Sequence, residues 1–186
     1  LQEVIYGSSD VAISKQISKF EKAGNIIKIA PRLYTSNLED KPENIIRRNI
    51  FSILGNLYPN SLLSHRSAIE FKPTGTNQIF VTYKYTRRVN LPGITIRFLK
   101  GNGPIQGDTI FSAKLFVSQR ERALLENLQS SRQSGDESKT LSKEKIEEYL
   151  EQIIRVNGEK ELNKVRDKTC EIADQLGWQA EFNNLN

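Results

Sequence analysis

A helix-length segment, followed at once by two short strands, constrains the beginning of this chain more than any other feature. Ile13, Ile17 and Phe20 recur at i, i+4 and i+7, the spacing of one apolar stripe on an amphipathic helix. Residues 8–10 (Ser-Ser-Asp) precede the stripe, and each can cap the first helical turn. Gly24 follows the last turn, where a left-handed residue ends a helix at low cost. The pattern predicts a short capped helix.

The residues after this helix have the pattern of a small hairpin. Residues 26–29 and 32–35 predict two strands around Ala30-Pro31. Burial of the apolar stripe would turn a polar and basic face outward, which consists of Ser14, Lys15, Ser18, Lys19 and Lys22. On such a face lysines can contact phosphates, and small serines fit close to base edges in a major groove.

The hairpin would add Lys28 and Arg32 to this face. Together the helix and hairpin predict the recognition helix and wing of a winged helix-turn-helix, with double-stranded DNA as the partner. The alternative interpretation is a surface helix and hairpin with ordinary solvated lysines. A complete winged helix has two further helices before the recognition helix, and residues 1–7 can supply at most part of one. Because the chain contains no Met, we expect the natural protein to begin before Leu1 and this winged helix to be truncated.

The composition limits the class of protein. A chain of 186 residues makes one or two domains, and it contains no apolar run that could span a membrane and no signal peptide. Its single cysteine, Cys170, excludes an internal disulfide framework and a cysteine-based zinc site, so a cytoplasmic location is the simplest prediction. The net charge of +5 permits a polyanionic partner.

The charge is unevenly distributed along the chain. Residues 1–40 hold five basic and five acidic side chains, residues 41–132 hold fourteen and five, and residues 133–186 hold eight and twelve. The basic surplus of nine therefore lies in the middle of the chain and not in the predicted helix and wing. If the chain binds DNA, the basic middle segment is expected to take part or to have another role.

The middle of the chain predicts a mixed unit of helices and strands. Residues 40–43 have the pattern of a capping box with Pro in the first turn, and an apolar stripe from Ile46 to Leu57 follows. A short strand is expected at 61–64, with Ser64 capping a brief helix through Ile69. From Gln78 the apolar period changes to two, and we expect strands at 79–83, 94–99 and 114–117 and a helix at 119–128.

The end of the chain predicts a pair of helices. A polar linker at 130–138 precedes helices at 141–156 and 159–176, and Ser142 with its apolar neighbours forms an N-terminal staple. The predicted class is thus α/β in the α+β sense, with three domains. These are a partial winged helix at 1–38, a basic mixed α/β domain at 39–131 and a helical hairpin at 140–186.

No segment carries a recognisable catalytic site. His65 is the only histidine and is expected to be structural or surface-exposed, and Cys170 is expected to be a buried, inert thiol. The glycines of residues 101–108 lack the Gly-Lys-Ser/Thr ending of a phosphate loop, so a loop between strands is expected. We predict no enzymatic activity, no cofactor and no metal site.

Cations interleaved with aromatic residues mark one further candidate site, consisting of Lys84, Tyr85, Arg87, Arg88, Arg97 and Lys100. Such a ribbon can hold a phosphate backbone, with the aromatic rings stacking or packing beneath the cations. Two alternatives are an edge strand protected from aggregation by its charges and a surface that holds RNA or an acidic protein.

Several of these segments together resemble the AbiEi antitoxins and related regulators of type IV toxin–antitoxin systems. The N-terminal residues of the resemblance are Ser9-Asp10, Ile13, Ile17, Phe20, Ala23-Gly24 and residues 32–36 (Arg-Leu-Tyr-Thr-Ser). The second domain adds Tyr58-Pro59, residues 63–68 (Leu-Ser-His-Arg-Ser-Ala), residues 91–93 (Leu-Pro-Gly), Arg120, residues 122–125 (Arg-Ala-Leu-Leu) and Asn127. The closing Leu162, Arg166-Asp167, Ala173 and Leu176-Gly177 look like the helical stretch that leads into a Fic domain.

The resemblance implies a DNA-binding regulator of an operon with antitoxin-type control. Its recognition helix would fall on Ser14, Lys15, Ser18, Lys19 and Lys22, and its wing on Lys28 and Arg32. An alternative is a regulatory protein-interaction module that restrains a partner toxin or an attached Fic AMP-transferase. The Fic motif itself is absent, so such an active site would lie beyond Asn186. A homodimer would suit a palindromic DNA site, although the sequence contains no heptad pattern that predicts a dimer.

Overall fold

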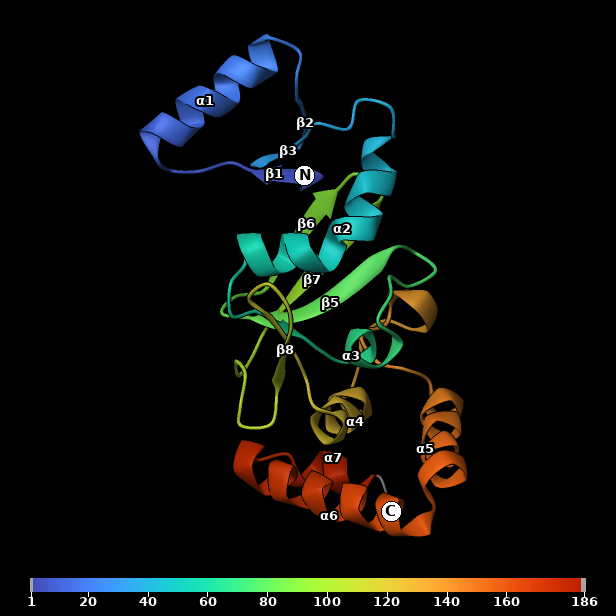
Figure 1. Cartoon of the computed structure of the whole chain (residues 1–186). Helices are drawn as coiled ribbons and strands as arrows, with labels where there is room; N and C mark the ends of the chain where they lie inside the picture. The colour runs from blue at the N-terminus through green and yellow to red at the C-terminus, as the bar shows by residue number, and fades with distance from the viewer. Residues whose placement is uncertain (1, 185–186) are drawn as a thin grey trace.

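The N-terminal segment folds as a strand, a helix and a hairpin. A computed structural model describes residues 2–184, and its first strand β1 (Val4–Tyr6) precedes helix α1 (Val11–Lys22) and strands β2 (Ile27–Ala30) and β3 (Leu33–Thr35). The three strands form an antiparallel sheet in the order β1-β3-β2. Helix α1 projects beyond this sheet at one end of the molecule (Figure 1). The predicted helix and hairpin are confirmed.

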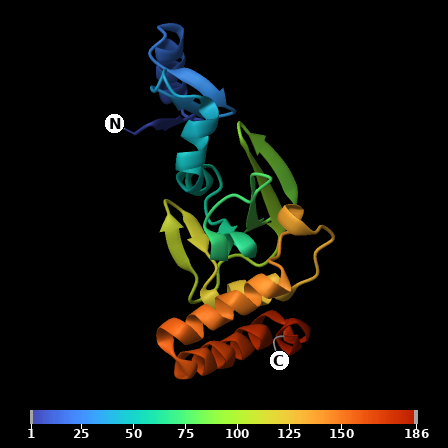
Figure 2. The same cartoon turned by 90° about the vertical axis from the view of Figure 1, so that its right-hand side faces the viewer.

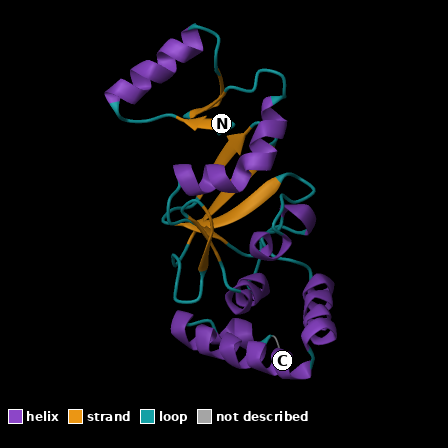
Figure 3. Ribbon diagram, viewed as in Figure 1, coloured by secondary structure: helices purple, strands orange, loops and turns teal. Residues whose placement is uncertain are grey.

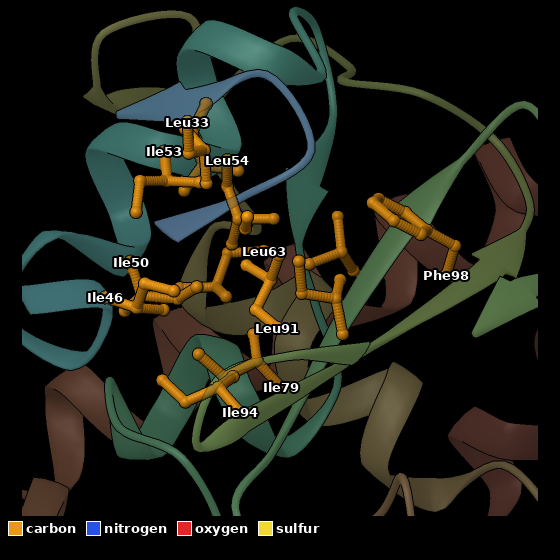
Figure 4. Packing of buried hydrophobic residues seen from close by; sticks show 14 of the residues in the cluster. Leu33, Ile46, Ile50, Ile53, Leu54, Leu63, Ile79, Leu91, Ile94 and Phe98 are labelled. Atoms are coloured by element: carbon orange, nitrogen blue, oxygen red, sulfur yellow. The ribbon is translucent and has the colours of Figure 1, made fainter. Parts of the chain in front are cut away.

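Helix α2 (Pro42–Leu57) lies between this small sheet and a larger one. Pro42 fits the first turn because its fixed φ suits a helix and the N–H that it lacks would have no partner there. The inward face of α2 contributes Ile45, Ile46, Ile50, Ile53 and Leu54 to the core. Figure 4 shows this face meeting Leu33 of β3 and apolar residues of the larger sheet. One core therefore continues from the N-terminal sheet into the middle of the chain.

The larger sheet has six strands in the order β6-β7-β5-β4-β9-β8. Figure 3 shows its strands in orange in the middle of the molecule. The pairs β5–β7 and β4–β9 are parallel, and the other neighbours are antiparallel. Its strands are β4 (Leu62–Leu63), β5 (Gln78–Tyr83), β6 (Arg87–Leu91), β7 (Ile94–Lys100), β8 (Thr109–Ser112) and β9 (Leu115–Val117). Helices and strands together confirm the predicted α+β class.

Helices α4 (Arg120–Leu128), α5 (Lys143–Asn157), α6 (Glu159–Leu176) and α7 (Gln179–Asn183) lie at the end of the molecule opposite to α1 (Figure 2). The short helix α3 (Arg66–Glu70) lies beside the larger sheet, and a 3-10 turn spans Gly135–Glu137. Leu124 of α4 packs on α5 and α6, and Leu125 packs on the end of α6. The Ser142 Oγ caps α5 by accepting the Lys145 N–H, as its sequence predicts. No helix within residues 2–184 has both the length and the apolar character needed to cross a bilayer.

The predicted burial of the α1 stripe is wrong for two of its three residues. Ile17 is 8 % exposed, but Ile13 and Phe20 are 47 % and 45 % exposed. Only the side of α1 that carries Ile17 faces the hairpin, and no other part of residues 2–184 covers the rest of the stripe. The stripe is thus amphipathic in sequence but only partly covered.

Two predicted helix caps are also wrong, because both side chains have other partners. Lys41 occupies the N-cap position of α2 without a side-chain bond, while Asp40 accepts from Arg48 and Asn37. The Ser64 hydroxyl bonds to the His65 ring and to Thr82 instead of capping α3.

Four further α-helices and β-strands were not predicted. Residues 2–7 contain strand β1 and not part of a helix, and the segment at 84–89, expected to be a ribbon or turn, leads into strand β6. The segment after the glycine-rich loop forms edge strand β8, and α7 follows α6. The glycine-rich segment itself is a loop, as expected. Of the two predictions for His65, a structural position is confirmed and an exposed one is wrong, since this residue is buried. Cys170 is a free thiol of intermediate exposure and is not buried as expected.

Candidate nucleic-acid interface

Helix α1 is defined at both ends by bonds that its sequence supplies. The Asp10 Oδ1 accepts the Ile13 N–H at 3.0 Å and so caps the first turn. At the other end Gly24 adopts a left-handed φ of 73°, and the Asn25 N–H donates to the Phe20 carbonyl at 3.0 Å. This bond closes a Schellman motif. Both ends therefore fix the length of a helix that has little tertiary packing.

The hairpin lies beside α1 and leaves a hollow between them. The hollow has a volume of about 490 Å³, and among its lining residues are Ser14 and Ser18 of α1 together with Lys28 and Arg32 of the hairpin. Arg32 stands in the turn between β2 and β3 with a left-handed φ of 62°, and its carbonyl accepts the Gly7 N–H at 2.8 Å. Four predicted site residues from two elements thus meet in one place.

A second hollow of about 420 Å³ adjoins the first on α1. It is lined by Ser14, Lys15, Ser18, Lys19 and Lys22, so the two hollows share Ser14 and Ser18. We call the residues that line these two hollows and were predicted from the sequence the head surface, which consists of Ser14, Lys15, Ser18, Lys19, Lys22, Lys28 and Arg32. The structure brings all seven together.

The five cations of the head surface form no ion pair within the described part of the chain. Among residues 2–184, no carboxylate oxygen lies within 4.0 Å of their nitrogen atoms. Three of the five acidic residues in residues 1–40 have other partners: Glu3 and Asp40 both pair with Arg48 of α2, and Asp10 caps α1. The other two, Glu21 and Glu39, are exposed and form no ion pair with the five cations. Hydrogen bonds from Arg48 lower the pKa of Glu3 to about 2. The neutral charge balance of residues 1–40 therefore conceals a basic surface.

The predicted basic ribbon is divided between the two faces of the larger sheet. Arg87 pairs with Phe98 and Arg88 with Arg97 across strands β6 and β7, and consecutive residues of a strand point to opposite faces. Arg97 is half-buried, donates to Gln78 at 2.8 Å and lies 4.0 Å from a Glu137 oxygen. Arg88 thus shares a face with a residue that is already bonded within the fold.

Arg87 lies on the face that approaches the N-terminal segment. Burial raises the pKa of Tyr58 at the end of α2, and the charges of Arg87 and Arg32 both oppose this rise. The Tyr58 ring lies 4.6 Å, between centroids, from that of Phe98, the cross-strand partner of Arg87, so Arg87 and Tyr58 share this face of the larger sheet.

The aromatic residues of the ribbon pack beneath it and do not stand free. Tyr85 lies edge-on to Tyr83 at 5.0 Å and to Phe98 at 5.7 Å between ring centroids. The Lys84 ammonium group lies 5.5 Å from the centroid of the Tyr83 ring. Of the two roles that the sequence allowed for these rings, the structure favours packing over stacking on bases.

The sequence did not identify two neighbours of the head surface. Tyr34 lines the first hollow beside Lys28, its cross-strand partner, and Tyr58 lies on the same face of the larger sheet as Arg87. The alternation of β3 could have revealed Tyr34, whereas only the tertiary fold places Tyr58.

No protein-family model, curated protein or solved structure matches this chain. The resemblance to AbiEi antitoxins therefore remains a prediction from the residues that carry it.

Proposed function

We propose that this chain is a DNA-binding transcriptional regulator in which α1 is the recognition helix and the β2–β3 hairpin is the wing. The observation that carries this proposal is the head surface, where cations and small polar residues from two elements line adjoining hollows with no carboxylate of residues 2–184 in ion-pairing distance. Cations without an ion-pair partner are free to contact a phosphate backbone. On binding, Lys and Arg side chains replace the counterions that are condensed on the DNA, and the release of these counterions favours the complex.

The shape of α1 supports insertion into a major groove. A helix with its side chains is about 10–12 Å wide, and the groove is about 12 Å wide. Helix α1 projects from the body of the molecule, so the rest of the chain leaves room for a duplex (Figure 1). Ser14 and Ser18 would face base edges, where a hydroxyl can donate and accept, and the flanking lysines would contact the backbone.

The hairpin and the larger sheet would extend the contact along the backbone. Lys28 and Arg32 lie on the hairpin beside α1, and Arg87 lies on the same face of the larger sheet as Tyr58. Such contacts position a protein on DNA without reading its sequence. Arg88, on the other face of the sheet, would contribute less than Arg87 does.

The resemblance gives this activity a setting. A regulator of the AbiEi type acts in the cytoplasm, represses its own operon and controls a cognate toxin, and a homodimer would read a palindromic operator. The regulatory protein-interaction module, with a toxin or an attached Fic domain as its partner, is the alternative function.

Fluorescence anisotropy with a labelled duplex of mixed sequence tests the proposal at low salt. Lys15→Ala plus Lys19→Ala should weaken binding by about tenfold or more, because two phosphate contacts are lost. The matched control, Lys143→Ala plus Lys160→Ala, removes the same charge from exposed positions at the opposite end of the molecule and should bind like the wild type. A wild-type chain that binds no duplex would overturn the proposal and favour the protein-interaction alternative.

A further inference from the structure

A further cavity lies far from the head surface, where six segments of the chain converge. Its volume is about 290 Å³, and it is lined by the β4–α3 junction, strand β5, the end of β7 with the loop after it, helix α4 with the residue that follows it, Lys139 ahead of α5, and the turn between α6 and α7. Six of the lining side chains carry the argument: His65, Lys100, Arg122, Gln129, Lys139 and Trp178. The volume falls just below the range of about 300–1,000 Å³ typical of pockets for drug-sized ligands, so a ligand would be small.

The polar wall of this cavity is built by a chain of hydrogen bonds. His65 is 5 % exposed, with its Nδ1 3.0 Å from the Ser64 Oγ and its Nε2 3.2 Å from the Gln129 Oε1. The same Gln129 oxygen accepts from the Lys139 Nζ at 3.2 Å. Since an amide oxygen only accepts, this network assigns the proton of the neutral imidazole to Nε2. Burial and the charge of Lys139 lower the pKa of His65 to about 3, so the ring is neutral at physiological pH.

The backbone at His65 is held in a sparsely populated conformation. Its φ of 54° and ψ of −139° are unusual for a residue with a side chain, and such strain persists only where the surroundings over-determine it. Here the His65 N–H donates to the Glu126 Oε2 at 2.9 Å, and that buried oxygen also accepts from the Ser118 hydroxyl. The fold therefore maintains a strained residue whose ring lines the cavity.

The charge of the cavity favours an anion. The Arg122 guanidinium is neutralised by Asp108 and Glu126, whose oxygens lie 2.6 and 3.0 Å from its nitrogens. In contrast, Lys100 and Lys139 have no carboxylate within 4.0 Å among the described residues. Two ammonium groups without an ion-pair partner among the described residues thus border a cavity in which the only lining carboxylate from that part of the chain, Glu126, is already paired with Arg122. The negative charges of Glu126 and Glu181 act on Lys139 only from beyond ion-pair distance.

One wall of the cavity is aromatic and fixed in place. Trp178 follows Gly177, which ends α6 with a left-handed φ of 72°, and the Trp178 N–H donates to the Ala173 carbonyl at 2.8 Å. The indole is partly buried against the apolar cluster at the end of α6. A planar ring beside it would gain contact at little cost in ordering, because the indole is already held.

We propose that this cavity binds a small anion attached to a planar ring, with Lys100 and Lys139 holding the anionic group and Trp178 contacting the ring. A nucleoside monophosphate and an aromatic carboxylate share this chemistry. The Gln129 amide and the neutral imidazole of His65 orient polar groups of the ligand. This site does not depend on the proposed DNA-binding function and lies at the other end of the molecule.

Fluorescence titration and calorimetry with AMP and with benzoate test this site. Trp178 is the only tryptophan in the chain, so its emission reports the cavity directly. AMP or benzoate should change the emission saturably at millimolar concentrations or below, and adenosine, which lacks the anion, should bind at least about tenfold more weakly than AMP.

Variants distinguish this site from binding elsewhere on the chain. Lys139→Gln should weaken binding of the active probe by about tenfold, whereas Lys143→Gln, an equal change of charge at an exposed position on α5, should not. Melting curves show whether each variant is folded. Absence of binding of both probes to the wild type by both methods would overturn the proposal, as would equal affinities of AMP and adenosine or equal affinities of the two variants.

Discussion

Arg122 allows the most quantitative prediction of this structure, because it is a buried charge with fully described partners. Its side chain is 1 % exposed and pairs with Asp108 and Glu126, which are equally buried. It also donates to the carbonyls of Asn102 and Gly103 at 2.7 and 2.9 Å. Arg122→Met would keep most of the side-chain volume and remove every one of these bonds. Two buried carboxylates would then lack their cation.

The loss of stability can be estimated from this geometry. Removal of one partner of a buried ion pair costs about 3–5 kcal/mol, compared with about 5–15 kcal/mol for the whole stability of a domain. With a urea dependence of about 2 kcal/mol/M, the unfolding midpoint should fall by about 1.5–2.5 M. Arg120→Met, two residues away on the same helix, is the control. Arg120 is a partly exposed ion-pair member, so its loss should cost about 0–1 kcal/mol.

The pH dependence makes this prediction more specific. Burial raises the pKa of Glu126, and Arg122 opposes that rise. Without Arg122 the pKa of Glu126 in the folded state should climb further above its value in the unfolded chain. A folded state that holds a proton more tightly loses stability as the pH rises through that interval. The deficit of the variant should therefore be larger at pH 8 than at pH 5.

Urea unfolding of both variants at pH 5 and pH 8, followed by circular dichroism, measures these quantities. A second substitution, Glu126→Gln, in the Arg122→Met background should remove most of the added pH dependence. A loss below about 1 kcal/mol at pH 8, or an equal loss at both pH values, would refute the assignment of Arg122 as the cation that this buried cluster requires.

Three further predictions concern the N-terminal half of the chain. Arg48 lowers the pKa of Glu3 only in the folded state, so the wild type should lose stability as the pH falls from about 4.5 through about 2. Glu3→Gln should abolish this part of the pH dependence. Equal slopes of the unfolding midpoint against pH for the two proteins in this range would contradict the prediction. Gly55→Ala should cost about 1–3 kcal/mol in urea unfolding, since its Cβ would clash with the Ser112 carbonyl oxygen and lie 2.8 Å from the Lys114 backbone nitrogen, and a variant as stable as the wild type would contradict that packing. Asp10→Ala should destabilise α1 by about 1 kcal/mol, seen as faster amide exchange in α1 with little change in the global midpoint, whereas unchanged exchange would show that the cap contributes nothing.

Local signals predicted the elements near the N-terminus well. The cap at Asp10, the left-handed Gly24 and the hairpin after it are all local features, and each stands where the sequence places it.

Signals that depend on tertiary structure were less informative. The sequence could not show that Ile13 and Phe20 stay exposed, because an apolar stripe predicts a partner without supplying one. Asp40 and Ser64 are likewise residue types suited to caps, but partners elsewhere in the fold bind their side chains instead.

The candidate interface was predictable in its residues but not in its charge. The seven residues of the head surface follow from helical and strand periodicity. The absence of ion pairs to these residues within 2–184 does not follow from the sequence, because the pairing of Glu3 and Asp40 with Arg48 joins three parts of the chain. Strand alternation alone would have placed Arg87 and Arg88 on opposite faces of the sheet, but the sequence did not identify their segment as strand β6. The ligand cavity gave no sequence signal, since its lining comes from segments far apart along the chain.

The salt dependence of duplex binding tests the central claim most directly. The logarithm of the observed binding constant should fall linearly with the logarithm of salt concentration, and each lost phosphate contact should reduce the slope by about one. We expect the slope of Lys15→Ala plus Lys19→Ala to be shallower by about two, that of Arg87→Ala by about one, and that of Lys143→Ala plus Lys160→Ala to equal the wild-type slope. A wild-type slope near zero, or a slope that the α1 substitutions leave unchanged, would contradict the assignment of α1 as the DNA-contacting helix.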